Sequence, residues 1–317
     1  MKAVFLDYAT MGPGLDVGPL SRFFAEFVCF DVTARDQVAD RIHDVEFVFA
    51  NKSLLRADVL GAATRLRMIG LTATGTDNVD LDAARRHGVA VCNIRAYCTS
   101  SVVEHVFGVL LMLTHNLARY DTAVRAGEWQ RAQDFCLLSH PIRELSAMTL
   151  GIVGHGELGR GVAAVAQAFG MRVLVAARPG VAPTSSARVP FDEVLAAADV
   201  LSLHCPLTDE THKLVDADAI ARMKSGAFLI NTARGGLVDS AALVAALESG
   251  HLAGAAVDVL SREPPMDGDP LLDYRGGNLI ITPHIAWAGN ESRQNAIAEL
   301  AANVEAFLAG RERNRVV

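Results

Sequence analysis

Short apolar runs alternate with amphipathic stretches along most of the chain. Stretches with helical spacing of apolar positions lie between the runs, among them Pro19–Phe27, Arg56–Ala62 and Leu81–His87. The apolar runs that have the length and composition of buried strands in the N-terminal part are Lys2–Asp7, Val28–Val32, Glu46–Ala50, Met68–Leu71 and Val89–Cys92. Strands that alternate with helices in this way predict a parallel sheet covered by helices on both faces.

After Asn93 the pattern changes to one long helix, expected over Ser100 to Gly127, with Thr99, Ser100 or Ser101 as its N-terminal cap. Apolar residues cover nearly every face of this helix, which is typical of a helix lodged between two domains. An irregular stretch, Glu128–Glu144, follows. It carries Trp129 and Phe135 and would need a partner if it were an exposed arm, so a subunit interface and packing onto its own domain both remain open.

A second alternating series follows the irregular stretch. Its expected strands are Thr149–Val153, Arg172–Ala176, Val200–His204, Phe228–Asn231, Ala255–Asp258 and Leu279–Thr282. The last helix, about Asn290 to Leu308, could cross back to the first domain. We therefore expect two α/β domains, one made of residues 1–97 and 288–317 and the other of residues 98–287.

Composition narrows the class of protein. The chain has 317 residues, with 36 acidic and 29 basic side chains and a net charge of −7, which disfavours nucleic acid as a partner. Hydrophobic residues make up 51% and charged residues 21%, as in a globular protein. The five cysteines are odd in number and form no CxxC pair, so we expect neither a disulfide framework nor a metal site.

Two apolar segments bear on targeting and membrane insertion. The N-terminal run is broken by Asp7, so it reads as a strand rather than a signal peptide. The most apolar long stretch, Ser101 to Leu117, contains Glu104 and His105 and falls short of a membrane span. We expect a cytoplasmic protein without membrane attachment.

The sequence Gly154-His155-Gly156-Glu157-Leu158-Gly159 is a GxGxxG motif that directly follows a predicted strand and opens a predicted helix. In that context the first glycine makes the turn, the second lets a pyrophosphate approach the backbone, and the third packs helix on strand. The motif predicts a Rossmann domain that binds a dinucleotide.

The next strand should end in an acidic residue that binds the ribose 2′-hydroxyl of NAD. Here it ends in Ala177 and Arg178. No carboxylate repels a 2′-phosphate, and Arg178 offers a forked donor for one. This pattern favours NADP(H), with NAD(H) use still possible if Arg178 is only a solvated loop residue.

Three further segments carry a family resemblance. They are Asn231-Thr232-Ala233-Arg234-Gly235-Gly236, then Val257–Leu260 leading to Glu263-Pro264-Pro265, then Thr282-Pro283-His284-Ile285-Ala286-Trp287. In order and spacing the chain resembles the D-isomer-specific 2-hydroxyacid dehydrogenases, most closely the glycerate dehydrogenase or hydroxypyruvate reductase branch. The resemblance implies a Rossmann domain inserted in a flavodoxin-like substrate domain, an active site between the two, and a homodimer.

Three residues suit the chemistry of reducing a small 2-keto acid. Arg234 can bind the carboxylate and carbonyl, because a guanidinium is always charged and bidentate. His284 can donate the proton, and Glu263 would orient that imidazole and favour its protonated form. The resemblance assigns the same roles to the same positions. Each residue alone has an ordinary structural interpretation, so the prediction rests on the set.

The resemblance also implies contacts with the cofactor and the substrate. Asp258 would orient the nicotinamide carboxamide, and Arg234 and His284 would contact both ligands. The other implied cofactor residues, besides the GxGxxG motif, Ala177 and Arg178, are Cys205, Pro206, Thr211, Thr232 and Ala233. The implied or possible substrate residues are Lys52, Thr74, Gly75, Thr76 and Trp287. Lys52 could equally be a solvated lysine, and Trp287 could pack on the last helix.

The expected activity is reduction of hydroxypyruvate or glyoxylate to the D-2-hydroxy acid by NADPH. Two other functions remain open. A related dehydrogenase could act on phosphite, formate or a larger 2-keto acid, and a corepressor-like protein could bind NAD(P) without turnover. The complete set of Arg234, Glu263 and His284 argues against the second.

Overall fold

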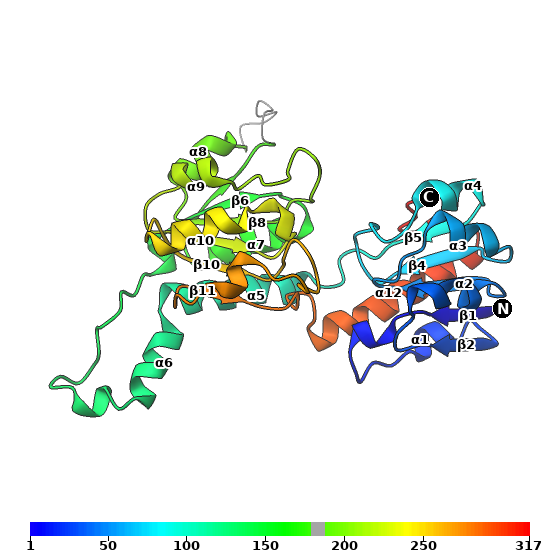
Figure 1. Ribbon diagram of the computed structural model, residues 1–317, viewed down its shortest axis with the longest axis horizontal. Coiled ribbons are helices and arrows are strands. Elements are labelled where there is room, and N and C mark those ends of the chain that lie inside the picture. Colours follow the sequence, from blue (N-terminus) through cyan, green and yellow to red (C-terminus); the bar gives the residue numbers. More distant parts are fainter. Residues whose placement is uncertain (179–187) are drawn as a thin grey trace. The chain divides into compact units, whose positions relative to one another are not determined.

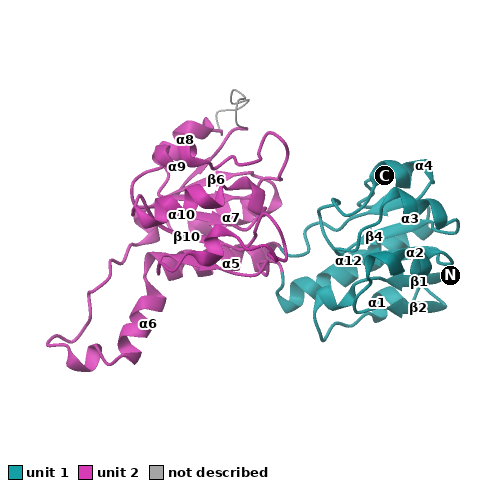
Figure 2. Ribbon diagram, in the orientation of Figure 1, with its two compact units in different colours: residues 1–98, 288–317 teal, residues 99–287 magenta. Residues whose placement is uncertain are grey.

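The computed structural model describes residues 1–178 and 188–317 and divides them into two compact units. Unit 1 comprises Met1–Cys98 and Ala288–Val317, and unit 2 comprises Thr99–Trp287 (Figure 2). Each unit has its own parallel sheet with helices packed on it, which confirms the predicted α/β class.

Unit 1 is built on a five-stranded parallel sheet of order β2-β1-β3-β4-β5, which is the flavodoxin-like order (Figure 1). Its strands are β1 Lys2–Phe5, β2 Glu26–Cys29, β3 Phe47–Ala50, β4 Met68–Leu71 and β5 Ala90–Cys92. Its helices are α1 Gly18–Ser21, α2 Val38–Ile42, α3 Ala57–Ala62, α4 Leu81–Arg86 and α12 Asn290–Leu308. The C-terminal helix α12 has the bounds that its hydrophobic pattern predicts.

The close packing of α12 on this sheet depends on small and aromatic residues. A Cβ atom on Gly70 of β4 would lie 3.0 Å from Leu300 of α12 and closer still to Phe49, so glycine permits this approach. On the same side Phe307 of α12 packs edge-on against Phe47, with ring centroids 5.8 Å apart. Burial of these apolar side chains joins the C-terminal segment to unit 1.

One predicted helix of unit 1 is wrong. The helix expected over Pro19–Phe27 ends at Ser21, and β2 begins at Glu26, earlier than the predicted strand Val28–Val32. The aromatic side chains that suggested helical spacing instead pack against the sheet. Phe24 stacks on Phe27 and contacts Phe47, with ring centroids 5.9 and 5.0 Å away. Tertiary packing of the rings therefore overrides the local pattern.

Unit 2 contains a six-stranded parallel sheet of order β11-β10-β9-β8-β6-β7. Its strands are β6 Thr149–Val153, β7 Arg172–Val175, β8 Val200–Leu203, β9 Ala227–Asn231, β10 Leu252–Val257 and β11 Leu279–Ile281. Its helices are α5 Thr99–Thr114, α6 Leu117–Arg125, α7 Glu157–Ala168, α8 Phe191–Ala197, α9 Ala217–Arg222, α10 Ser240–Glu248 and α11 Pro270–Asp273. Strand order reverses between β6 and β8, where open α/β sheets bind their ligands.

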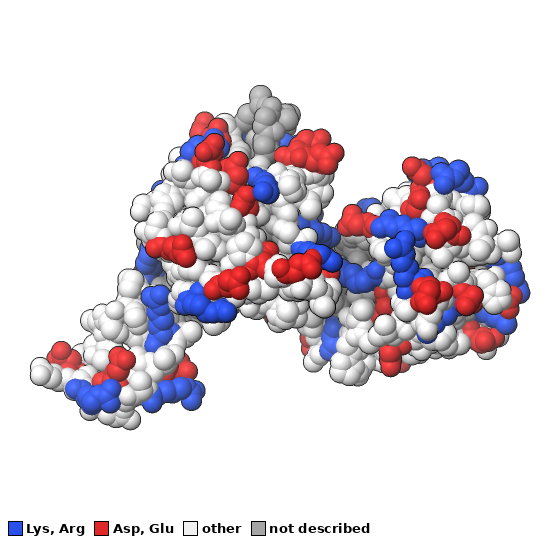
Figure 3. Space-filling view, viewed as in Figure 1, with Lys and Arg blue, Asp and Glu red and all other residues white. Residues whose placement is uncertain are grey.

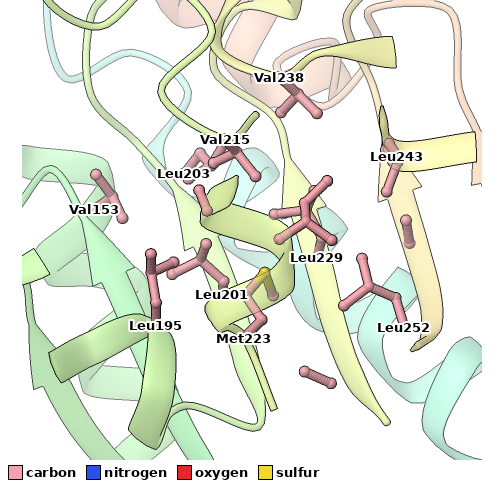
Figure 4. Packing of buried hydrophobic residues seen from close by; sticks show 14 of the residues in the cluster. Val153, Leu195, Leu201, Leu203, Val215, Met223, Leu229, Val238, Leu243 and Leu252 are labelled. Atoms are coloured by element: carbon pink, nitrogen blue, oxygen red, sulfur yellow. The ribbon is translucent and has the colours of Figure 1, made fainter. Parts of the chain in front are cut away.

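The core of unit 2 lies between the sheet and the helices that follow β7, β8 and β9. Leu201, Leu203 and Leu229 of the strands are fully buried against Leu195 and Met223 (Figure 4). Four of the six strands, β6, β8, β9 and β10, are buried over nearly their whole length, as expected of a covered parallel sheet. This core holds the carboxyl ends of the strands, and thus the loops after them, in fixed positions.

The long helix expected over Ser100 to Gly127 is broken. Helix α5 ends at Thr114 and α6 begins at Leu117 after a bend of 56°. Asn116 makes the break, because it adopts a left-handed φ of 51° and its side-chain amide donates to the Pro141 carbonyl. Within the described residues no single helix is long and apolar enough to cross a membrane, and α5 and α6 meet that test only as a bent pair.

Helix α6 and the irregular segment after it project away from the sheet of unit 2 (Figure 1). We call residues 117–144 the arm. Phe135 and Leu138 of the arm are 90% and 81% exposed, and Trp129 is half exposed, with its indole N–H donating to the Phe135 carbonyl. On the face shown in Figure 3, acidic and basic side chains are interspersed over the surface of each unit.

Candidate active site

The three residues predicted to carry the chemistry follow adjacent strands of unit 2. Arg234 comes after β9, Glu263 after β10 and His284 after β11, and these strands pair in the order β9-β10-β11. Because all strands are parallel, their carboxyl ends meet at one edge of the sheet. That edge is where ligands bind in this class of sheet.

His284 and Glu263 form a short, direct pair. Nδ1 of His284 lies 2.6 Å from Oε2 of Glu263, and Oε1 of the same carboxylate accepts the backbone N–H of Leu260 at 2.9 Å. About a third of the Glu263 side chain and a quarter of the His284 side chain remain exposed. The carboxylate fixes the proton on Nδ1, so Nε2 of the ring is the atom left to exchange a proton with a ligand.

Asp258 holds the loop that carries His284. Its carboxylate is buried and accepts the backbone N–H groups of Ile285 and Ala286, each at 2.9 Å, and the hydroxyl of Thr282 at 2.6 Å. His284 itself has a φ of 56°, in the left-handed region that few residues other than glycine occupy. The Asp258 contacts on either side of His284 determine this conformation.

Three more contacts fix the same loop. The backbone N–H of His284 donates to the Asp258 carbonyl at 2.7 Å, and the indole N–H of Trp287 donates to the His284 carbonyl at 3.0 Å. The hydroxyl of Ser101, at the start of α5, donates to the Ala286 carbonyl at 2.7 Å. Trp287 therefore contacts the histidine loop directly.

Arg234 is exposed at the end of a tight turn. The side chain of buried Asn231 holds that turn, because its amide group donates to the Arg234 carbonyl and its oxygen accepts the Ala233 N–H. A Cβ atom on Gly235 would lie 2.0 Å from the Leu260 carbonyl carbon, so only glycine allows this turn to touch the segment leading to Glu263. The Arg234 guanidinium donates to the Ala233 carbonyl, and among the described residues no carboxylate pairs with it.

The glycines of the GxGxxG motif have distinct surroundings. Gly154 has a φ of 92°, and a Cβ atom there would lie 2.5 Å from the backbone of Cys205. A Cβ atom on Gly159 would lie 2.1 Å from the Gly154 carbonyl oxygen. Gly156 instead faces open space at the N-terminus of α7, which has no side-chain cap. A helix N-terminus without a side-chain cap fits the pyrophosphate of a dinucleotide.

Glu157 and Leu158 begin α7, and both are partly buried. The hydroxyl of Thr99 in α5 donates to the Glu157 carboxylate, so this side chain ties two helices of unit 2 together. Glu157 therefore has a structural contact in addition to its predicted place beside the cofactor.

Basic side chains lie around the end of β7. Ala177 is buried and Arg178 is exposed. The guanidinium of Arg188 donates to the Ala176 carbonyl at 3.0 Å, which places a second arginine beside this strand end. Burial, followed by the charges of Arg188 and Arg160, lowers the pKa of His155 below its ordinary value. Several basic side chains thus lie around the end of β7.

The segment after β8 makes a compact turn. The Thr211 hydroxyl donates to the Pro206 carbonyl and accepts the Thr208 N–H, so Thr211 acts within the turn. Burial raises the pKa of the Cys205 thiol above its ordinary value. Oγ1 of Thr232 is buried and lacks a hydrogen-bond partner within the described part of the chain.

His204 lies next to this turn and is partly buried. Its Nε2 contacts the Ser202 hydroxyl at 2.8 Å, and its Nδ1 is buried without a hydrogen-bond partner among residues 1–178 and 188–317. Burial lowers the pKa of His204 to about 4. The ring is therefore neutral near pH 7.

The predicted substrate residues Lys52, Thr74, Gly75 and Thr76 lie in unit 1, after adjacent strands β3 and β4. The carboxylate of Asp7 accepts the backbone N–H groups of residues 51, 52 and 53 at 2.8, 2.7 and 2.6 Å. The Asn78 amide group donates to the carbonyl of Ser53 at 3.0 Å. The loop of Lys52 and the loop of residues 74–78 are thereby joined.

Several residues that hold these loops have no role predicted from the sequence. Asp7 and Asn78 hold the loops of unit 1 by hydrogen bonds. Thr282 contacts the Asp258 carboxylate, and His105 contacts Thr282. Arg188 lies beside the end of β7. Asp7 had a recognisable signal, since it is an acidic residue at the end of a predicted buried strand, like Asp258. Thr282 stands in the segment Thr282–Trp287 that carries the family resemblance. Asn78, His105 and Arg188 are separated along the chain from their contacts and had no local signal.

Comparison with known proteins adds to this geometry. A family model described as the D-isomer specific 2-hydroxyacid dehydrogenase, NAD binding domain, matches residues 107–286. Glycerate dehydrogenase of Methylorubrum extorquens is 43% identical over 315 residues, which cover 99% of this chain and 98% of that protein. Hydroxypyruvate reductase of Blautia hydrogenotrophica is 37% identical over 317 residues, covering 98% of each.

A solved structure shows the same architecture. D-lactate dehydrogenase from Aquifex aeolicus, in complex with NAD and lactic acid, has a TM-score of 0.80 and 29% sequence identity. The match covers 97% of this chain and 96% of that one. The likeness therefore spans both units.

Proposed function

Because the chain belongs to the D-isomer specific 2-hydroxyacid dehydrogenase family, we propose that it reduces hydroxypyruvate and glyoxylate to the D-2-hydroxy acids, with NADPH as the preferred reductant. Family membership makes it an oxidoreductase that uses a nicotinamide dinucleotide and acts on small 2-keto or 2-hydroxy acids. It also confirms the resemblance noted in the sequence and the Rossmann fold of unit 2.

The observation that carries the proposal is the His284–Glu263 pair. Reduction of a 2-keto acid makes an alkoxide that needs a proton as the hydride arrives, and the bound reduced nicotinamide supplies that hydride. His284 is held through Nδ1 by Glu263, so its Nε2 can donate the proton. Loss of that proton leaves a neutral ring whose Nδ1–H still bonds to the carboxylate.

Arg234 is proposed to bind the substrate. Its guanidinium is exposed at the same sheet edge and is bonded only to a backbone carbonyl among the contacts described. A guanidinium in that state can hold the carboxylate and polarise the adjacent carbonyl in the transition state. Trp287, bonded to the His284 carbonyl, is proposed to form part of the pocket wall.

Unit 2 is proposed as the cofactor domain and unit 1 as the substrate domain. In unit 2 the assignment includes the glycine-rich turn, Cys205, Pro206, Thr211, Thr232, Ala233 and Asp258. Asp258 retains lone-pair capacity beyond its three accepted hydrogen bonds, so contact with the carboxamide is compatible with its hold on the loop. In unit 1, Lys52 and the backbone of Thr74, Gly75 and Thr76 would bind the substrate carboxylate.

The preference for NADPH is supported by the charges around the end of β7. Ala177 stands where an acidic residue would bind a 2′-hydroxyl, and Arg178 follows it. Arg188 adds a second guanidinium anchored to the Ala176 carbonyl. Two forked donors suit a phosphate group better than a neutral ribose.

A homodimer is proposed on the basis of the arm. Phe135 and Leu138 expose large apolar side chains on a segment that projects from unit 2. Large apolar side chains exposed on a projecting segment are typical of an interaction surface. A second copy of the chain is the partner that fits a symmetric enzyme of this class.

The decisive experiment is a matrix of initial rates. NADPH and NADH are each tested with hydroxypyruvate, glyoxylate, pyruvate and 2-ketobutyrate. Faster oxidation of NADPH than of NADH with hydroxypyruvate supports the proposed activity and cofactor preference. Equal rates with both cofactors support the activity and contradict the NADPH preference. Cofactor binding without turnover on any acid would contradict the proposal and favour a binding protein.

A further inference from the structure

His105 lies beside the Asp258 cluster although it is far from it in the sequence. It projects from α5, and its side chain is 17% exposed. Nε2 of His105 lies 3.2 Å from the hydroxyl oxygen of Thr282 and 3.9 Å from Oδ1 of Asp258. The Thr282 hydroxyl therefore sits between an imidazole nitrogen and a buried carboxylate.

The number of hydrogens decides the direction of these bonds. The Thr282 hydroxyl has a single proton, and its oxygen lies 2.6 Å from Oδ1 of Asp258, which as a carboxylate can only accept. The hydroxyl thus donates to Asp258. The contact with His105 is then an N–H donated from Nε2 to the hydroxyl oxygen. A directed chain results, from His105 through Thr282 to Asp258.

The same carboxylate holds His284 in place. Asp258 accepts the N–H groups of Ile285 and Ala286, the two residues after His284. His284 occupies a left-handed backbone conformation that these bonds must maintain. A change in the direction of the Asp258 carboxylate would therefore move the imidazole that faces the substrate.

We infer that His105 is a positioning residue for the reaction, acting through Thr282 and Asp258 on the placement of His284. This inference rests on the proposed role of His284 as the proton donor. His105 is proposed to contact neither substrate nor cofactor. It fixes the orientation of the Thr282 hydroxyl, and the oriented hydroxyl fixes one oxygen of Asp258.

The test uses variants that separate hydrogen bonding from packing. His105→Leu keeps apolar bulk but loses the N–H donor, and His105→Gln keeps a side-chain amide donor close to the place of Nε2. Thr282→Val removes the hydroxyl with little change of shape. His115→Leu, which removes a histidine just after α5 whose ring contacts the Thr114 hydroxyl, is the matched control.

We expect His105→Leu to lower kcat by about 3- to 10-fold, the effect of losing one hydrogen bond, with KM for hydroxypyruvate and the Kd for cofactor changed less than about twofold. His105→Gln should recover most of that loss, and His115→Leu should match the unchanged enzyme. Because His105 acts through Thr282, the double variant His105→Leu/Thr282→Val should be no slower than Thr282→Val alone.

Three results would overturn the inference. The first is a kcat for His105→Leu equal to that of the unchanged enzyme, whatever happens to Tm. The second is equal loss in His105→Leu and His105→Gln, which indicates packing. The third is multiplication of the two single effects in the double variant. If Thr282→Val fails to fold, the comparison of His105→Leu with His105→Gln still distinguishes loss of a hydrogen bond from loss of packing. Full turnover in His284→Ala would instead refute the proposed function on which the inference rests.

Discussion

Oε2 of Glu263 lies 2.6 Å from Nδ1 of His284, and the other oxygen of that carboxylate is held by the Leu260 N–H. The imidazole is therefore oriented by a group that is itself oriented. We expect His284→Ala to lower kcat by about 10²-fold or more, since the Nε2 donor that would protonate the alkoxide is lost. The Kd for NADPH, measured by fluorescence titration, should remain close to that of the unchanged enzyme.

Glu263→Gln is the companion variant. Its amide oxygen can still accept the Leu260 N–H, but its NH₂ group would then face Nδ1 and move the ring proton to Nε2 in the neutral form. That ring lacks a carboxylate to stabilise its charged form, so kcat should fall while cofactor binding persists. For the first variant, near-normal turnover in His284→Ala would contradict the role of His284 as the proton donor.

The cofactor preference can be tested at Ala177. Ala177→Glu places a carboxylate where the 2′-phosphate is proposed to bind, and charge repulsion should lower the ratio of kcat/KM for NADPH over NADH by about tenfold or more. Ala177→Gln has nearly the same size without the charge and is the control. If Ala177→Glu and Ala177→Gln gave the same ratio, the 2′-phosphate site would not lie at this strand end.

His204 should make the protein less stable in mild acid. The pKa of its imidazole is about 4 in the folded chain and 6.5 ordinarily, so the unfolded chain binds more protons between these values. Stability present above pH 6.5 is therefore lost as the pH falls toward 4, by on the order of 2 kcal/mol at pH 5. Urea unfolding at pH 7 and pH 5 should show a smaller loss in His204→Gln than in the unchanged chain. An identical loss in both would mean that His204 ionises freely when folded.

Local pattern predicts elements well where burial alone decides them. The bounds of α12 and β4 follow from the apolar spacing of Asn290–Leu308 and Met68–Leu71. The local pattern gave wrong bounds where a tertiary contact determines the end of an element. The ring of Phe24 packs on Phe47 and ends α1 early, and Asn116 breaks the long helix by bonding to the Pro141 carbonyl.

The candidate site also has a part that the sequence predicts and a part that only tertiary contacts determine. Order and spacing along the chain predict that residues such as Arg234 and His284 follow adjacent strands, because parallel strands end at one edge. The pairing of His105 with Thr282, 177 residues apart, depends on how α5 crosses the sheet of unit 2. Such a contact has no counterpart in local spacing, so it could be found only in the folded chain.

The arm offers a test of assembly. Phe135→Glu or Leu138→Glu places a charge on a side chain that is almost fully exposed in the single chain, so folding of the chain itself should be unaffected. If these side chains are buried between two copies, the charge should shift the mass measured by light scattering from twice the chain mass to that of one chain. Val32→Glu, at an exposed apolar residue of unit 1, is the control. A mass of one chain for the unchanged protein would contradict the proposed dimer.

Asp7 should govern substrate affinity through the loop of Lys52. Both of its oxygens accept backbone N–H groups, Asn51 on Oδ1 and Lys52 and Ser53 on Oδ2. In Asp7→Asn the amide NH₂ group must therefore face an N–H donor in either orientation, which should displace the loop and lower the free energy of unfolding by about 1–3 kcal/mol. We expect KM for hydroxypyruvate to rise about tenfold while KM for NADPH is unchanged, as measured by initial rates. Asp58→Asn, on the exposed side of α3, is the control. A fall in stability with an unchanged KM for hydroxypyruvate would show that this loop, Lys52 included, does not bind the substrate.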